Sequence, residues 1–136
     1  MRHWLDLGKA LPGLRGRTVH LLAQDREREL VDILEGASFV VRRLEGGKAI
    51  DQAGFFAEAS RALGLPDHFG HNWDALDECL RGLGEGRSRR LALLWRSADL
   101  SLAADPQMVL DAASLFADVA RELGGEDPPT QIEVFL

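Results

Sequence analysis

The sequence predicts an α/β protein in which a small parallel β-sheet of three to four strands is packed with helices. Short apolar runs alternate along the chain with amphipathic helical segments, an order typical of parallel sheets. The run Arg90–Trp95 is apolar almost throughout, as expected of a strand that is buried on both faces. Helix start and stop signals, such as Asp105-Pro106 and Gly64, separate the segments.

The composition indicates one globular domain. The chain has 136 residues, of which 46% are apolar and 28% charged, and this length buries a core without a disulfide or metal. The single cysteine, Cys79, excludes an internal disulfide and fits a reducing compartment. The N-terminus lacks the apolar core of a signal peptide, and no segment approaches the ~20 apolar residues of a membrane helix. We therefore expect a cytoplasmic protein with no membrane contact.

The N-terminal third predicts an extension to the main domain. Residues 1–17 lack periodicity and are punctuated by glycine and proline, as in a loose leader. Thr18–Ala23 is typical of a short strand, and Asp25 is expected to cap a helix that ends at Gly36. We expect residues 1–36 to pack as leader, strand and helix on the same domain as residues 37–136.

The rest of the chain continues the alternation of strands and helices. Apolar periodicity and the flanking turn residues set the expected boundaries. The expected elements are a strand Ser38–Leu44, a helix from Asp51 to Gly64, a loop over 67–71, a helix Trp73–Leu83, the strand Arg90–Trp95, a helix from Asp105 to Leu123 and a strand Gln131–Leu136.

The helix Trp73–Leu83 carries the main functional signal. At 100° per residue its apolar side chains share one side, and Asp74, Asp77, Glu78 and Arg81 share the other. Such a face is either an ordinary solvated surface or a recognition surface for a cationic partner. The net charge of −6, from 22 acidic and 16 basic residues, disfavours binding to nucleic acid. It suits binding to a basic protein that itself binds nucleic acid.

The loop before this helix contains two histidines. Asn72 is a plausible N-cap, and we expect Gly70 to supply a backbone angle that other residues disfavour. His68 and His71 are spaced as a metal-binding pair, but no third ligand is evident. An enzyme could use either histidine with Asp74 or Glu78 as acid and base. Because no nucleophile, phosphate loop or metal set accompanies them, we predict no enzyme activity, no metal and no cofactor.

The run Leu65–Leu80 closely resembles the central motif of the barstar family. That motif reads leucine-proline, acid, two aromatic-type positions, glycine, any residue, asparagine, large apolar, aspartate-alanine-leucine, then acid, cysteine and leucine. Leu93–Arg96 resembles the family's middle strand, and Phe116–Gly124 resembles its last long helix. The resemblance covers roughly residues 37–136.

This resemblance implies a fold, a function and a binding site. The family folds as a small parallel sheet with helices, and its known members inhibit guanyl-type extracellular ribonucleases such as barnase. A helix and the loop before it plug the enzyme's active site, with carboxylates standing where RNA phosphates would lie. Asp74 corresponds to the first helix aspartate of the family and Glu78 to its dominant acid. The implied partner-binding residues are His68, Gly70, Asn72, Asp74, Asp77, Glu78 and Asp118.

Three of these positions depart from the family pattern. Glu78 replaces an aspartate, His68 replaces a contact tyrosine, and Asp77 stands where the best-known member has tryptophan. The first hypothesis is a cytoplasmic, monomeric inhibitor of a basic barnase-type ribonuclease. The alternative is a barstar-like interaction module that binds another small basic protein without inhibiting a nuclease.

Overall fold

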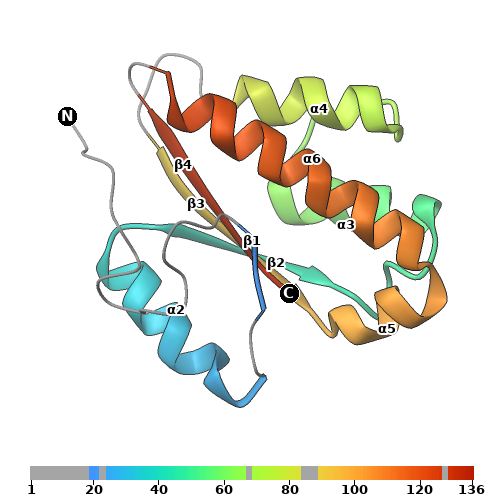
Figure 1. Ribbon diagram of the computed structural model, residues 1–136, viewed down its shortest axis with the longest axis horizontal. Helices are drawn as coiled ribbons and strands as arrows, with labels where there is room; N and C mark the ends of the chain where they lie inside the picture. The colour runs from blue at the N-terminus through green and yellow to red at the C-terminus, as the bar shows by residue number, and fades with distance from the viewer. Residues whose placement is uncertain (1–18, 22–23, 67–68, 84–88, 127–128) are drawn as a thin grey trace.

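A four-stranded parallel sheet lies between helices on both of its faces (Figure 1), which confirms the predicted α/β class. The computed structural model describes residues 19–21, 24–66, 69–83, 89–126 and 129–136. The sheet has the order β1-β4-β3-β2. Its strands are β1 (Val19–His20), β2 (Val40–Glu45), β3 (Arg89–Arg96) and β4 (Thr130–Phe135). The helical elements are η2 (Gln24–Arg26), α2 (Glu27–Gly36), α3 (Gln52–Leu63), α4 (Trp73–Gly82), α5 (Ala98–Ala104) and α6 (Pro106–Gly124).

The handedness of the crossovers explains why α2 lies apart from the other helices. From β2 to β3 to β4 the chain steps toward the β1 edge, with α3, α4 and α6 on one face. From β1 to β2 it steps across the whole sheet in the opposite direction. Because parallel crossovers are right-handed, this reversed step places α2 on the opposite face. The described residues therefore form three layers (Figure 1).

The central strand β3 has the buried environment that its sequence predicts. It pairs with β2 on one side and β4 on the other, and Ala92, Leu93, Leu94 and Trp95 are all buried. Leu93 and Trp95 pack with α3, α4 and α6, whereas Ala92 and Leu94 pack with α2. The unbroken apolar run Leu91–Trp95 of β3 therefore supplies both halves of the core. No helix among the described residues is long and apolar enough to cross a membrane.

The predicted start and stop signals of α3 and α6 are confirmed. Asp51 Oδ1 accepts a hydrogen bond from the Gly54 amide at 2.7 Å, and Gly64 ends α3 with a φ of 63°. Asp105 Oδ1 accepts a hydrogen bond from the Met108 amide at 3.1 Å, with Pro106 as the first residue of α6. Local capping chemistry fixes the boundaries of both helices.

Two expectations near the sheet edges differ from the structure. Within the described residues the first strand is only Val19–His20, and Asp25 makes no cap hydrogen bond, because η2 precedes α2 and places Arg26 at the N-cap. Helix α5 was not predicted. It is anchored by Ser101, whose hydroxyl donates to the Gly46 carbonyl at 2.9 Å and accepts from the Trp95 indole at 3.0 Å. The expected leader, residues 1–17, lies outside the described residues.

Strand β4 buries polar side chains that its sequence alone would place in solvent. Glu133 Oε2 lies 2.9 Å from His20 Nε2, and both side chains are almost fully buried. The His20 ring also stacks on Phe135, with centroids 4.9 Å apart. Strand β1 thus contributes an ionisable partner that makes burial of Glu133 tolerable.

An ion pair from α3 covers part of the free edge of β2. The Glu58 carboxylate accepts a hydrogen bond from the Glu45 amide at 3.0 Å, and Arg61 Nη2 donates to the Arg43 carbonyl at 2.9 Å. Arg61 also pairs with the buried Glu58 carboxylate at 2.8 Å. Backbone groups that an unpaired edge strand leaves open are thereby satisfied. The Arg61 hydrogen bond is the main cause that lowers the pKa of Glu58 below its usual range.

We expect Glu58→Gln to lower the free energy of unfolding by about 1–2 kcal/mol near pH 7, since it removes a charge-assisted bond. Because the folded pKa of Glu58 is lowered, its stabilisation is present above the unfolded pKa and disappears as the pH falls through the folded value. Urea unfolding at several pH values should show the two proteins converging in acid. Glu35→Gln, at an exposed position on α2, serves as the control. A difference that persists unchanged in acid would contradict this account.

Candidate functional site

The N-terminus of α4 is fixed by a cap that the sequence predicted. Asn72 Oδ1 accepts a hydrogen bond from the Ala75 amide at 2.8 Å. The same side chain donates from Nδ2 to the Gly70 carbonyl at 3.2 Å, which ties the loop to the helix. This confirms Asn72 as the N-cap. Both Gly70 and Asn72 are exposed.

The expectation that Gly70 supplies an unusual backbone angle is wrong. The left-handed residue in this loop is His71, with a φ of 49°, and Gly64 is the glycine with positive φ among the described residues. Gly70 instead allows a close approach, because a Cβ there would lie 3.2 Å from Asn72 Nδ2. His68, which the resemblance places in the binding site, lies outside the described residues.

The inner face of α4 holds the helix in one orientation. Leu76 and Leu80 are fully buried in the core that α3 and α6 share. Trp73 packs edge-on against Phe56, with ring centroids 4.9 Å apart, and lies 5.5 Å from Phe55. This close packing of the inner face fixes the direction in which the opposite face of α4 points.

The outer face of α4 presents its acids to solvent. Asp74 and Glu78 are exposed, and Asp77 is half-buried. These three residues line a surface hollow of about 390 Å³ together with Arg81 and Gly82. Asp74 and Glu78 make no ion pair among the described residues, whereas Asp77 accepts a hydrogen bond from Arg81 Nε. Asp74 and Glu78 therefore lie on the outer side of the helix, where its periodicity placed them.

Helix α6 adds acids to the same side of the molecule. Glu122 pairs with Arg81 across the two helices, and Asp118 precedes Glu122 by one turn. Asp118 is exposed and accepts a hydrogen bond from Arg121 at 3.0 Å. The i, i+4 spacing of Asp77 and Arg81 allows their pair within one helix. No such spacing indicates the Arg81–Glu122 pair, because that contact depends on how α4 packs against α6.

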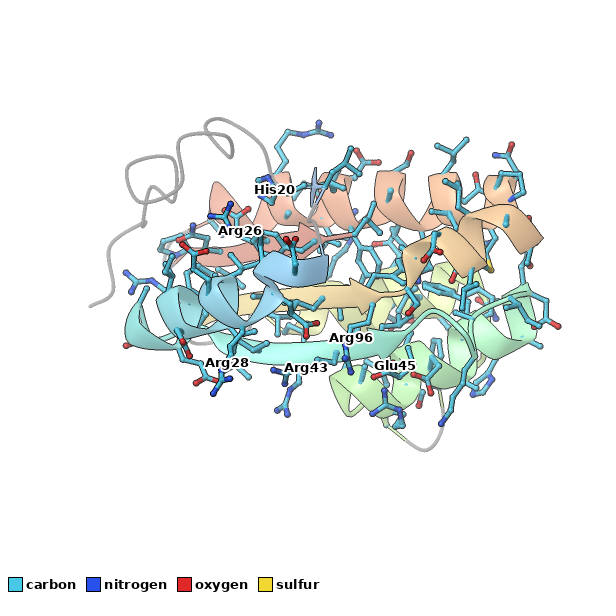
Figure 2. The ribbon with its side chains drawn as sticks, turned by 90° about the horizontal axis from the view of Figure 1, so that it is seen from below. His20, Arg26, Arg28, Arg43, Glu45 and Arg96 are labelled. Carbon is cyan, nitrogen blue, oxygen red and sulfur yellow. The ribbon has the colours of Figure 1, made fainter. Side chains whose placement is uncertain are left out.

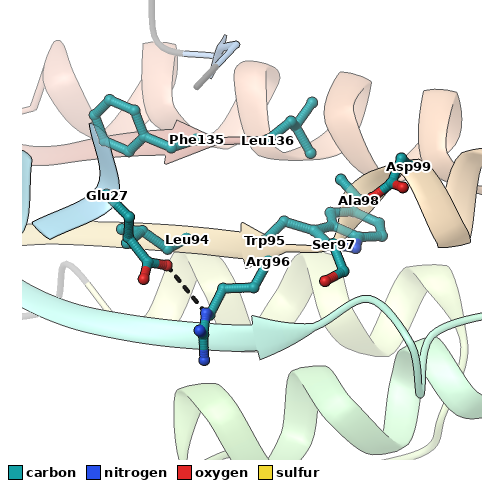
Figure 3. Close-up of a pocket in the computed structure, with 9 residues that line it drawn as sticks. All are labelled: Glu27, Leu94, Trp95, Arg96, Ser97, Ala98, Asp99, Phe135 and Leu136. Atoms are coloured by element: carbon teal, nitrogen blue, oxygen red, sulfur yellow. Dashed lines mark ion pairs between the residues drawn. The ribbon is translucent and has the colours of Figure 1, made fainter. Parts of the chain in front are cut away.

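Figure 3 shows a second, larger cavity. Its volume is about 670 Å³, and it lies at the carboxyl ends of β3 and β4 beside the start of α2. Arg96 enters it and is held by Glu27 at 3.0 Å and by Glu45 at 3.2 Å. Figure 2 shows Arg96 and Glu45 side by side on the α2 side of the sheet. None of the predicted site residues lines this cavity. Its cation is already paired with two carboxylates.

Within the ranges that the structure describes, no group of three or more histidine, cysteine, aspartate or glutamate side chains is arranged to hold a metal ion. His71 is exposed and lies against Phe69, with ring centroids 5.0 Å apart. Phe69 itself is buried and packs on Phe56, so His71 stands on an anchored loop.

The fold and this site define a small parallel α/β protein with a rigid, exposed acidic helix face. A family model described as "Barstar (barnase inhibitor)" matches residues 39–135, and the chain belongs to the barstar family. No curated protein matched the chain. Members of this family are inhibitors rather than enzymes, and they bind ribonucleases. The match begins at β2 and leaves out β1 and α2. The division at residue 36 stays a prediction.

Proposed function

We propose that this chain inhibits a basic, barnase-type guanyl-specific ribonuclease by docking α4 and the loop before it into the enzyme's active site. The observation that carries this proposal is the pair Asp74 and Glu78. Both are exposed on one face of α4, four positions apart, and neither has a cationic partner within the described residues. Membership of the barstar family supports the proposal. In this role the chain acts as a cytoplasmic monomer.

Charge complementarity supplies the physical basis for such binding. A ribonuclease active site needs lysine and arginine to hold phosphate groups. Two carboxylates one helical turn apart offer a cationic site the charge that RNA would otherwise supply. Opposite potentials speed the encounter of the two proteins and fix their register.

The packing of α4 reduces the loss of conformational entropy that would accompany binding. Asn72 caps the helix, and Trp73, Leu76 and Leu80 anchor its inner face. The carboxylates therefore need little ordering when a partner arrives, and rigid presentation of this kind favours affinity. Within the described part of the N-terminal extension, β1 is an edge strand of the sheet and α2 lies on the face opposite α4, so neither covers α4 (Figure 1).

Titration of a barnase-type ribonuclease with this chain tests the proposal. Activity should fall in proportion to added chain until one chain is present per enzyme molecule. Raising the salt from about 50 mM to about 500 mM should weaken inhibition by about tenfold or more, because screening acts on exposed charges. A pancreatic-type ribonuclease, with a differently shaped basic site, is the control.

Calorimetry on the same samples separates the two hypotheses. Binding that leaves ribonuclease activity intact would favour the interaction module over the inhibitor. Absence of both binding and inhibition at micromolar concentrations would contradict the proposal.

A further inference from the structure

The acids on the α4–α6 side fall into two sets according to their partners. Arg81 donates from Nε to Asp77 on its own helix and pairs through Nη1 with Glu122 on α6. Arg121 pairs with Asp118. Among the described acids of α4 and of the last two turns of α6, Asp74 and Glu78 are the two without a cationic partner. Only part of the acidic face is therefore free to receive cations.

Arg81 lies beside both the acids that it pairs with, Asp77 and Glu122, and the two acids that have no cationic partner. Its side chain is 38% exposed, and it lines the same surface hollow as Asp74 and Glu78. A guanidinium group is planar and has five N–H donors, so two carboxylates on different helices hold it without using all of them. A cation that approaches Asp77 or Glu122 meets the charge of Arg81 first. The remaining donors are available to an acceptor on the partner.

We infer that Arg81 is a specificity-determining residue of this face, an inference that rests on the proposed function. It keeps Asp77 and Glu122 occupied and confines the partner's cations to Asp74 and Glu78. The matching partner surface carries two cationic side chains spaced for carboxylates whose Cβ atoms lie about 5–6 Å apart. It carries a neutral or anionic group opposite Arg81. A uniformly cationic surface is disfavoured, because like charges across an interface repel.

A titration with arginine amide tests this inference without any nuclease. Carboxyl ¹³C signals of the folded chain would be followed by NMR while this small cation is added. In the wild type, the signals of Asp74 and Glu78 should move at least about twice as far as those of Asp77 and Glu122, whose cation is already bound. In Arg81→Met, which keeps the apolar stem but removes the charge, all four should move alike. The control, Arg121→Met, should change only Asp118. Equal movement of all four signals in the wild type would overturn the inference.

A binding cycle with barnase supplies a second test. Asp77→Asn should change affinity by less than about threefold in the wild type but by about tenfold in Arg81→Met, because the two residues interact directly. Glu78→Gln should weaken binding in both backgrounds. An equal cost of Asp77→Asn in both backgrounds would overturn the role of Arg81. If no variant binds barnase, the proposed function fails, and the arginine amide titration still decides whether Arg81 sorts the carboxylates.

Discussion

Charge reversal at Asp74 and Glu78 together should weaken ribonuclease binding by at least about a thousandfold, because each lysine replaces an attraction with a repulsion. Both side chains are exposed, and neither makes an ion pair within the described residues. Their replacement should therefore leave the core intact. A lysine in the first turn of α4 opposes the helix dipole, which we expect to cost about 0.3–1 kcal/mol of stability. Isothermal titration calorimetry and urea unfolding of the double variant measure the two effects separately.

A matched variant on the far side of the molecule provides the control. Asp32→Lys with Glu35→Lys changes the net charge by the same amount, but on α2, across the sheet from α4. If the local arrangement of carboxylates matters, this control should keep most of its affinity. Equal losses in both double variants would mean that only net charge drives binding. The neutral pair Asp74→Asn with Glu78→Gln covers the case in which the lysines disturb folding, and it should also lose affinity.

The sequence predicted those elements whose signals are local. Asp51, Asp105 and Pro106 stand at helix starts because capping needs only neighbouring residues. The buried character of β3 was evident from its unbroken apolar run. Helix α5 was missed because it is short and is held by Ser101, whose partners Trp95 and Gly46 come from the ends of two strands. Such contacts exist only once the sheet has formed.

In the candidate site too, local patterns predicted some features, whereas contacts between distant segments were missed. Helical periodicity placed Asp74 and Glu78 on the outer face, and the structure has both exposed. The left-handed position was assigned to Gly70 because glycine favours that region, yet His71 occupies it. The pairing of Arg81 with Glu122 needs the packing of α4 against α6, which no local pattern encodes.

The departure at Asp77 gains a structural explanation from this pairing. The resemblance places a tryptophan of the best-known family member at this position, and an unpaired carboxylate there would add charge to the acidic face. In this chain Asp77 is instead bound by Arg81, which itself reaches α6. The substitution exchanges an aromatic contact surface for an ion-paired link between two helices. The charge that remains free for a partner is thus concentrated at Asp74 and Glu78.

Phe55→Ala should have the largest effect on stability, with a loss of about 3–5 kcal/mol in the free energy of unfolding. Phe55 is fully buried, and its ring stacks on Trp95 with centroids 5.2 Å apart. It also contacts Trp73 at 5.5 Å and Phe116 at 6.4 Å. One ring on α3 therefore joins β3, α6 and the first residue of α4. Its removal leaves a cavity that these elements cannot fill together, and the midpoint of thermal unfolding should fall by about 10–20 °C.

The same variant should weaken partner binding even where it remains folded, because Trp73 loses a neighbour that orients α4. Phe39→Ala is the matched control, since Phe39 is also buried but belongs to the cluster under α2. Both variants should lose stability, whereas only Phe55→Ala should lose affinity under conditions in which each is fully folded. Urea unfolding and calorimetry at low temperature make the comparison. A loss below about 1 kcal/mol for Phe55→Ala would show that the core does not depend on this ring. Equal affinities for the two variants would show that packing beneath Trp73 does not set the acidic face.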